Sequence, residues 1–275
     1  MAERRSAGGP GTFSPARLRR LGEIAASFIG LLVIWEIAVA IFAFPQYILP
    51  PPSLIWTDML DHLGPIMSAA RFTAIPMLYG FFTAVVFGVL IALGVAFSRF
   101  VEAAIYPIII FLQIVPKIAV APLFIIWFGF GLAPKVLLVF LLSFFPVLVS
   151  SITGFRSVDP DIMDLARATG ASRWRIFFKV QLPHALPTLF TGFKVAAALS
   201  STAAVVAEFV ASDRGLGYLL LEYNGNLETA LSFAAILVLS VLGLALYGAV
   251  EIIERIAIPW HVSQRTAEPK DLGAA

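Results

Sequence analysis

The chain has 275 residues, of which 60% are hydrophobic and 13% are charged, and its mean hydropathy is +0.92. Soluble domains carry roughly 25% charged residues, and a soluble fold this apolar would expose patches that aggregate. The composition therefore excludes a soluble globular protein and predicts an integral membrane protein without a large extramembrane domain. The chain has no cysteine, which excludes disulfides and thiol chemistry. The formal net charge of +2 comes from dispersed basic residues, so nucleic acid is not an expected partner.

Six apolar segments are each near or above the roughly 20 residues that a membrane-spanning helix needs. They cover residues 24–44, 74–97, 103–128, 136–155, 188–211 and 230–258, and the third is interrupted at Pro116-Lys117. No strand-like alternation recurs at the spacing of a membrane barrel. The expected fold is an all-α integral membrane protein with about six transmembrane helices.

The N-terminal region could be either a cleaved signal peptide or a retained membrane helix. Ala38-Val39-Ala40 resembles a cleavage site, but the apolar run before it exceeds the about 7–15 residues of a signal peptide. We therefore expect a retained first helix. Residues 1–20 are rich in Gly, Pro, Ser and Arg and are expected to be a disordered basic cytoplasmic tail. Residues 21–260 would form the transmembrane domain and 261–275 a second cytoplasmic tail.

The positions of lysine and arginine predict the orientation, because cytoplasmic loops carry an excess of both. With the N-terminus inside, the inner segments hold fourteen such residues and the outer segments hold three, Arg71, Lys135 and Arg214. Both termini are therefore expected in the cytoplasm. The loop of residues 156–187, between the fourth and fifth helices, is expected on the same side.

The outer connections have a different composition. Residues 45–70 predict a short interfacial helix with Ser53 as its N-cap. Residues 212–229 contain Gly215, Gly217 and Gly225 and fit either a short helix over the outer mouth or an ordinary loop.

The cytoplasmic loop predicts two short helices joined by a tight turn. Asp159-Pro160 has the residues preferred at a helix start, and Gly170 can adopt the left-handed conformation that ends a helix. A second helix is expected from residue 172 to 181, broken by Leu182-Pro183 and Pro187. Exposed arginines beside Trp174 are typical of a binding hot spot. The alternative is an amphipathic helix that lies on anionic membrane lipid.

This loop resembles the EAA loop of the membrane-spanning subunits of bacterial ABC importers. That pattern is Glu-Ala-Ala, three residues, Gly, nine residues, Ile, one residue and Leu-Pro. The sequence keeps every spacing with Asp164-Leu165-Ala166, Gly170, Val180 and Leu182-Pro183. It departs from the pattern in Asp for Glu, Leu for the first Ala, and Val for Ile.

Residues 30–260 resemble the nitrate, sulfonate, taurine and thiamine-precursor branch of that family. Further matching segments include Trp127-Phe128-Gly129, Val158-Asp159-Pro160 and Gly215-Leu216-Gly217-Tyr218. The resemblance implies a multi-pass permease of the bacterial inner membrane. This permease would form a homodimer with a second copy or pair with another permease. The resemblance also implies a cytoplasmic ATP-binding subunit and a periplasmic or lipid-anchored substrate-binding protein. The expected ATPase-coupling residues are Asp164, Leu165, Ala166, Arg167, Gly170, Arg173 and Trp174.

The sequence itself indicates that ATP hydrolysis occurs elsewhere. It has no G-x-x-x-x-G-K-[ST] phosphate loop. The three histidines lie in different regions without metal-ligand spacing, and no nucleophile has a base at a useful spacing. We expect neither enzymatic activity, nor a cofactor, nor a metal site.

Polar residues within the spans are candidates for the translocation pathway, because such residues usually face a bundle interior or a cavity. The candidates are Gln113, Pro116, Lys117, Ser200, Ser201 and Glu208. A snorkelling lysine or a structural ion pair of Glu208 with Lys117 or Arg214 are the simpler alternatives. Lys194 is expected to reach the cytoplasmic interface, and Glu36 is expected in a contact between helices or subunits.

The expected function is solute translocation in an ATP-driven importer, for a sulfonate- or nitrate-like anion or a small heterocyclic precursor. The alternative is an ion-coupled secondary transporter that uses Lys117 and Glu208. The sequence has no evident internal inverted repeat, which disfavours that alternative.

Overall fold

The structure is a computed structural model that describes residues 15–261, and the regular structure in this range is entirely helical. The predicted all-α fold is therefore confirmed. Five long helices dominate it: α1 (Pro15–Phe42), α3 (Leu63–Phe97), α6 (Leu132–Phe155), α9 (Leu182–Ala211) and α11 (Thr229–Ala257). Residues 1–14 and 262–275, which hold most of the two predicted tails, lie outside the described residues.

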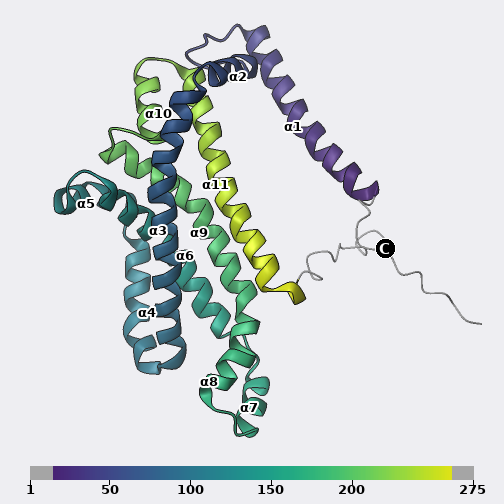
Figure 1. The fold of residues 1–275 in the computed structure, drawn as a ribbon, viewed down its shortest axis with the longest axis vertical. Coiled ribbons are helices and arrows are strands. Elements are labelled where there is room, and N and C mark those ends of the chain that lie inside the picture. Colours follow the sequence, from purple (N-terminus) through teal and green to yellow (C-terminus); the bar gives the residue numbers. More distant parts are fainter. Residues whose placement is uncertain (1–14, 262–275) are drawn as a thin grey trace, which may run out of the picture.

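Two pairs of short helices lie at opposite ends of the bundle (Figure 1). The first pair, α2 (Pro52–Asp61) and α10 (Leu216–Gly225), lies at one end, and α7 (Pro160–Ala168) and α8 (Arg173–Ile176) lie at the other. The α10 helix settles the open choice for residues 212–229 in favour of a short helix. The long helices between the ends are apolar enough to cross a membrane.

The third predicted span is not a straight helix. It consists of α4 (Arg99–Ile114), the 3-10 turn η1 (Lys117–Val120) and α5 (Ala121–Phe128), and its two halves meet at 87°. Pro116 lies at this corner, where its missing N–H cannot continue the α4 ladder. The described residues thus contain five candidate spans, or six if the bent pair is one.

Helix α3 begins at Leu63, eleven residues before the predicted start of the second span. Arg71, expected in the outer loop, is an exposed residue of this helix. The predicted start fell short because the charged Arg71 interrupts the apolar run before residue 74.

The expected break at Leu182-Pro183 is wrong. Residues 173–210 instead form one continuous rod through α8, the π turn η2 (Phe177–Gln181) and α9. In the π turn, the Leu182 N–H donates to the carbonyl of Phe177, five residues earlier. We attribute the tolerance of Pro183 to this wider turn, since it changes which carbonyl faces a residue without an N–H.

Helix α1 is attached to the rest of the chain only near its C-terminal end (Figure 1). Trp35 packs against Phe233 of α11 at 5.5 Å. The expected capping role of Ser53 is wrong, because α2 begins at Pro52 after the N-cap Pro51. Ser53 instead donates from Oγ and from its N–H to the carboxylate of Glu36, at 2.7 and 3.1 Å. The negative charge of this carboxylate is stabilised by the positive N-terminal end of α2. These hydrogen bonds place Glu36 in a contact between helices, one of its two expected roles.

The core is formed by α3, α6 and α9, whose backbones approach closely at glycines. A Cβ added at Gly80 would lie 2.5 Å from Val139 Cβ and 2.9 Å from the Val136 carbonyl oxygen. A Cβ added at Gly192 would lie 2.4 Å from Ser150 Cβ. Small residues let membrane helices pack this closely, which maximises van der Waals contact.

We predict that Gly80→Ala destabilises the protein although alanine is the better helix former. The added methyl group must push α3 away from α6, at a cost of about 1–3 kcal/mol. This cost should lower the melting temperature of the purified protein by roughly 5 °C. Gly64→Ala on the same helix is the matched control, because no atom lies within 4 Å of its added Cβ. Equal melting temperatures for the two variants would contradict the close-packed interface.

Candidate functional site: a coupling loop and buried polar contacts

The loop of residues 156–187 forms a knob of two short helices, α7 and α8. The Asp159 carboxylate accepts the N–H of Asp161 at 2.8 Å and caps α7. Gly170 has a φ of +70°, the left-handed conformation expected of it, and the Ser172 hydroxyl then accepts the N–H of Arg175 at 3.4 Å. Local capping and one glycine therefore set the angle between α7 and α8.

The predicted coupling residues lie together on this knob, at one end of the molecule (Figure 1). Leu165 and Trp174 are 69% and 63% exposed, and Asp164 pairs with Arg167 at 3.0 Å. Arg173 and Gly170 are also exposed, whereas Ala166 is half-buried. An exposed apolar and cationic surface of this kind is suited to a protein partner.

An aromatic cluster joins the knob to the membrane helices. The rings of Trp174 and Phe177 each lie 5.1 Å from Phe97, the last residue of α3. Phe177 also lies 5.6 Å from Phe155, the last residue of α6. Trp174 was singled out from the sequence, but the partners Phe97 and Phe155 in this cluster were not. The sequence signal available for these two partners was the aromatic residue at the last position of the second and of the fourth predicted span.

The predicted pathway residues Gln113, Pro116 and Lys117 lie together at the corner between α4 and η1. The Lys117 Nζ donates to the Gln113 carbonyl at 3.2 Å and lies 4.8 Å from the centre of the Phe145 ring. Gln113 and Pro116 are exposed and Lys117 is half-buried. A cation at this corner is therefore held by a carbonyl and an aromatic face.

Ser200 and Ser201 lie on α9 and donate to carbonyls of their own helix. The Ser200 Oγ donates to Ala197 at 2.7 Å, and the Ser201 Oγ donates to Ala198 at 3.0 Å. Ser200 is fully buried, and Ser201 contacts Gly243 of α11, where an added Cβ would lie 2.9 Å from its hydroxyl. Within this chain, both serines serve close packing of α9.

Glu208 is fully buried where α3, α9 and α10 meet. Its Oε2 accepts the Thr73 hydroxyl at 3.0 Å and the Gly217 N–H at 2.7 Å. Thr73 in turn accepts the N–H of Leu216 at 2.8 Å. A Cβ at Gly215, whose φ is +111°, would lie 2.3 Å from the Glu208 carboxylate. The resulting bracket of Glu208 and Thr73 fixes the start of α10, and neither suggested ion-pair partner of Glu208 takes part in it.

A second polar contact links α9 to α11. Lys194 forms an ion pair with Glu254 at 2.9 Å, and the Glu254 side chain is only 3% exposed. Lys194 was expected to reach the cytoplasmic interface, and the structure adds a partner that the sequence did not indicate, a buried carboxylate one helix away. Charged groups within a membrane usually pair in this way.

The comparisons with known proteins agree with this architecture. A family model described as the binding-protein-dependent transport system inner membrane component matches residues 84–257. The chain is 34% identical over 221 residues to a probable ABC transporter permease protein of Haemophilus influenzae, covering 80% of this chain and 90% of the relative.

Two further relatives are named for a solute. One is the riboflavin transport system permease protein RibX of Chloroflexus aurantiacus, 36% identical over 237 residues, with 85% of this chain and 88% of the relative covered. The other is the taurine transport system permease protein TauC of Escherichia coli, 31% identical over 238 residues, with 84% and 86% covered.

A solved structure shares the fold. The inward-facing MetNI methionine ABC transporter superposes with a TM-score of 0.56 at 19% identity, covering 70% of this chain and 98% of that one. Together with the family match over residues 84–257, the helical spans show that the chain belongs to the binding-protein-dependent ABC transporter permeases, multi-pass proteins of the bacterial inner membrane.

Proposed function

We propose that this permease forms the solute pathway of an ATP-driven importer, with two copies enclosing the pathway and an external binding protein delivering the solute. A cytoplasmic ATP-binding subunit would dock on the knob formed by residues 160–181. The observation behind this proposal is the knob itself. It exposes Trp174 and Arg173 and packs directly on the ends of α3 and α6.

The mechanism follows from how the knob is attached. Closure of an ATPase dimer would push on α7 and α8, whose angle is fixed by Gly170. Phe177 would pass this push to Phe97 and Phe155, and so to two long helices at once. Tightly packed aromatic rings are suited to this role, because protein interiors transmit strain rather than absorb it.

The orientation and the solute are parts of the same proposal. The excess of lysine and arginine at the knob end supports a cytoplasmic position for that end and for both termini. The solute would be a small organic or inorganic anion or a small heterocycle. The names of the relatives support this range, since they include riboflavin, taurine and formylaminopyrimidine transport proteins.

The pathway would be lined by the bent α4–α5 segment and by α9. Lys117 lies at the corner with Gln113 and Pro116, and we still predict that it is the cationic residue of this pathway. The use of Lys117 and Glu208 as an ion-coupling pair has less support. Their hydrogen bonds go to separate partners, the Gln113 carbonyl for Lys117 and Thr73 and Gly217 for Glu208.

Gly170→Val should uncouple ATP hydrolysis from uptake. A β-branched residue at a φ of +70° is strained by about 1–3 kcal/mol, so the knob would change its angle. Solute accumulated per ATP hydrolysed, measured in proteoliposomes with the full complex, should fall by about fivefold or more. Gly225→Val is the control, because that position is open and lies away from the knob. Normal association with the ATPase together with normal uptake would refute the coupling role.

Substitutions of Glu208 distinguish a structural bracket from an ion-coupling group. Glu208→Gln keeps an oxygen that can accept from Gly217 and Thr73, so uptake should stay close to that of the unmodified protein. Glu208→Leu leaves the buried N–H of Gly217 unsatisfied, at about 1–3 kcal/mol, whereas Thr73 can still donate to the Ala69 carbonyl. This loss should lower the melting temperature by roughly 5 °C. A folded Glu208→Gln protein without uptake would instead support ion coupling.

The energy source can be tested directly in cells that express the transporter with its partners. Uptake should stop when cellular ATP is depleted and should persist when a protonophore collapses the proton gradient while ATP is maintained. The reverse result would favour the secondary transporter.

A further inference from the structure

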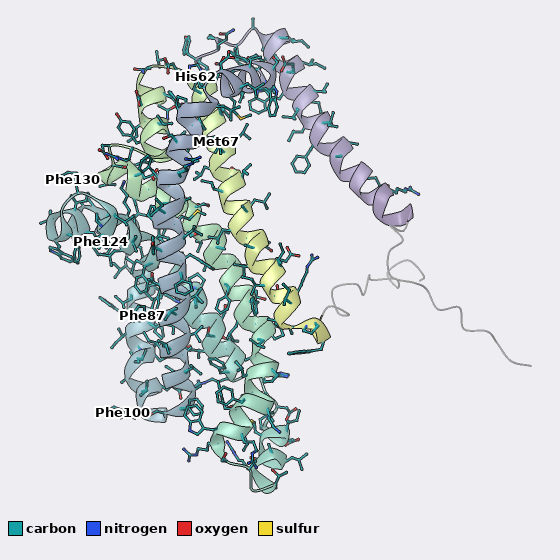
Figure 2. All side chains as sticks on the ribbon, in the orientation of Figure 1. His62, Met67, Phe87, Phe100, Phe124 and Phe130 are labelled. Carbon is teal, nitrogen blue, oxygen red and sulfur yellow. The ribbon has the colours of Figure 1, made fainter. Side chains whose placement is uncertain are left out.

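A pocket of about 760 Å³ lies between α3, the end of α9 and the start of α6. It is remote from the knob, and the labelled Phe130 marks the loop beside it in Figure 2. Its volume is within the range of about 300–1,000 Å³ typical of small-molecule sites. Lys135 and Phe72 both line the pocket, and neither was predicted from the sequence to contact the solute.

Lys135 is the unusual residue of this pocket. It is 8% exposed, so it does not snorkel to water, and its Nζ donates to the Ser212 hydroxyl at 2.5 Å. An ammonium group has three donors, and no carboxylate lies within ion-pair distance of Lys135 among residues 15–261. The nearby Glu208 and Asp213 attract it only from a longer distance. A buried cation paired only with a hydroxyl is costly and would gain from an anionic ligand.

A second cation lies on the pocket wall. Arg214 lies with its guanidinium carbon 5.1 Å from the centre of the Phe72 ring. It donates to both carboxylate oxygens of Asp213, at 3.1 and 3.0 Å, and these hydrogen bonds lower the pKa of Asp213. Two of its five donors are used in this way. The wall thus presents two cations and one already paired carboxylate.

The remaining walls suit the rest of an organic anion. Gly131 and Leu132 bring the N-terminus of the 24-residue helix α6 to the pocket, where the helix dipole favours negative charge. Phe72, Phe130 and Phe209 are 40%, 80% and 43% exposed and supply aromatic faces.

We propose that this pocket binds a small organic anion, whose carboxylate or sulfonate group lies at Lys135 and whose apolar part packs on Phe72 and Phe209. The pocket would receive the solute before it moves into the pathway. This inference rests on the proposed function and deepens it by assigning the class of solute.

The test uses the full-length permease in lipid nanodiscs, without ATPase or binding protein, and isothermal titration calorimetry. Benzoate and benzenesulfonate are the anionic probes, and benzamide is the neutral analogue of benzoate. At least one of the two anions should bind at least about tenfold more tightly than benzamide, the factor expected for a charge-assisted hydrogen bond. The stronger of the two identifies whether a carboxylate or a sulfonate is preferred.

Variants then locate the bound group. Lys135→Met should weaken anion binding by about tenfold or more, and Lys135→Arg should retain most of it. Arg214→Gln should have an intermediate effect. Arg71→Gln is the matched control, because Arg71 is an exposed neighbour of Phe72 and does not line the pocket. Melting temperature and gel-filtration profile report whether each variant is folded.

Affinities of both anions no higher than that of benzamide, absence of anion binding, or unchanged anion binding by a folded Lys135→Met protein would each overturn the assignment. Should Lys135→Met fail to fold, the comparison of anionic with neutral probes in the unmodified chain and Arg214→Gln decide it. ATP-driven uptake without anion binding would overturn the pocket alone. Anion binding with ATP-independent uptake would overturn the proposed energy source alone.

Discussion

Close approach of α3, α6 and α9 is the constraint on which the rest of this structure depends. Lipid tails are as apolar as leucine, so membrane helices gain little hydrophobic energy from one another and must rely on dense contact. Gly80 and Gly192 allow that contact, because the side chain of the facing helix occupies the place of their missing Cβ atoms. Within this core, α9 continues from α8 as one long rod that runs from the knob to the opposite end of the molecule.

Buried polar contacts fix the relative positions of helices, which apolar packing alone would not specify. The bracket of Glu208 and Thr73 fixes α10 against α3 and α9, and the pair of Lys194 with Glu254 fixes α11 against α9. Both lie in buried surroundings, where an unsatisfied partner is costly and alternative arrangements are disfavoured. Because both contacts include α9, the position of this helix determines where α10 and α11 lie.

Much of this fold could be predicted from the sequence, because span length and helix caps are local signals. Asp159 and Gly170 have the predicted roles, and the interruption at Pro116 is real. Two of the failures depend on a partner distant in the sequence, and one depends on an unusual local turn. Ser53 was expected to cap its own helix but pairs with Glu36 of α1. Leu182-Pro183 was expected to end a helix, but a π turn carries the chain through. Thr73 gave no local sign that it would receive Glu208.

The geometry also assigns different mechanical roles to different helices in the proposed transport cycle. The rod of residues 173–210 has 38 residues, which corresponds to about 57 Å at about 1.5 Å per residue, so a push on the knob reaches the far pocket without an intervening loop. The α4–α5 segment is bent by 87° at Lys117, and the ion pair of Glu102 with Arg156 ties it to the end of α6. A rigid rod moving against a bent segment that is tied at the end nearer the knob can change their separation at the corner. Lys117 lies at that corner, so a change in the rod's position would alter access to this cation first.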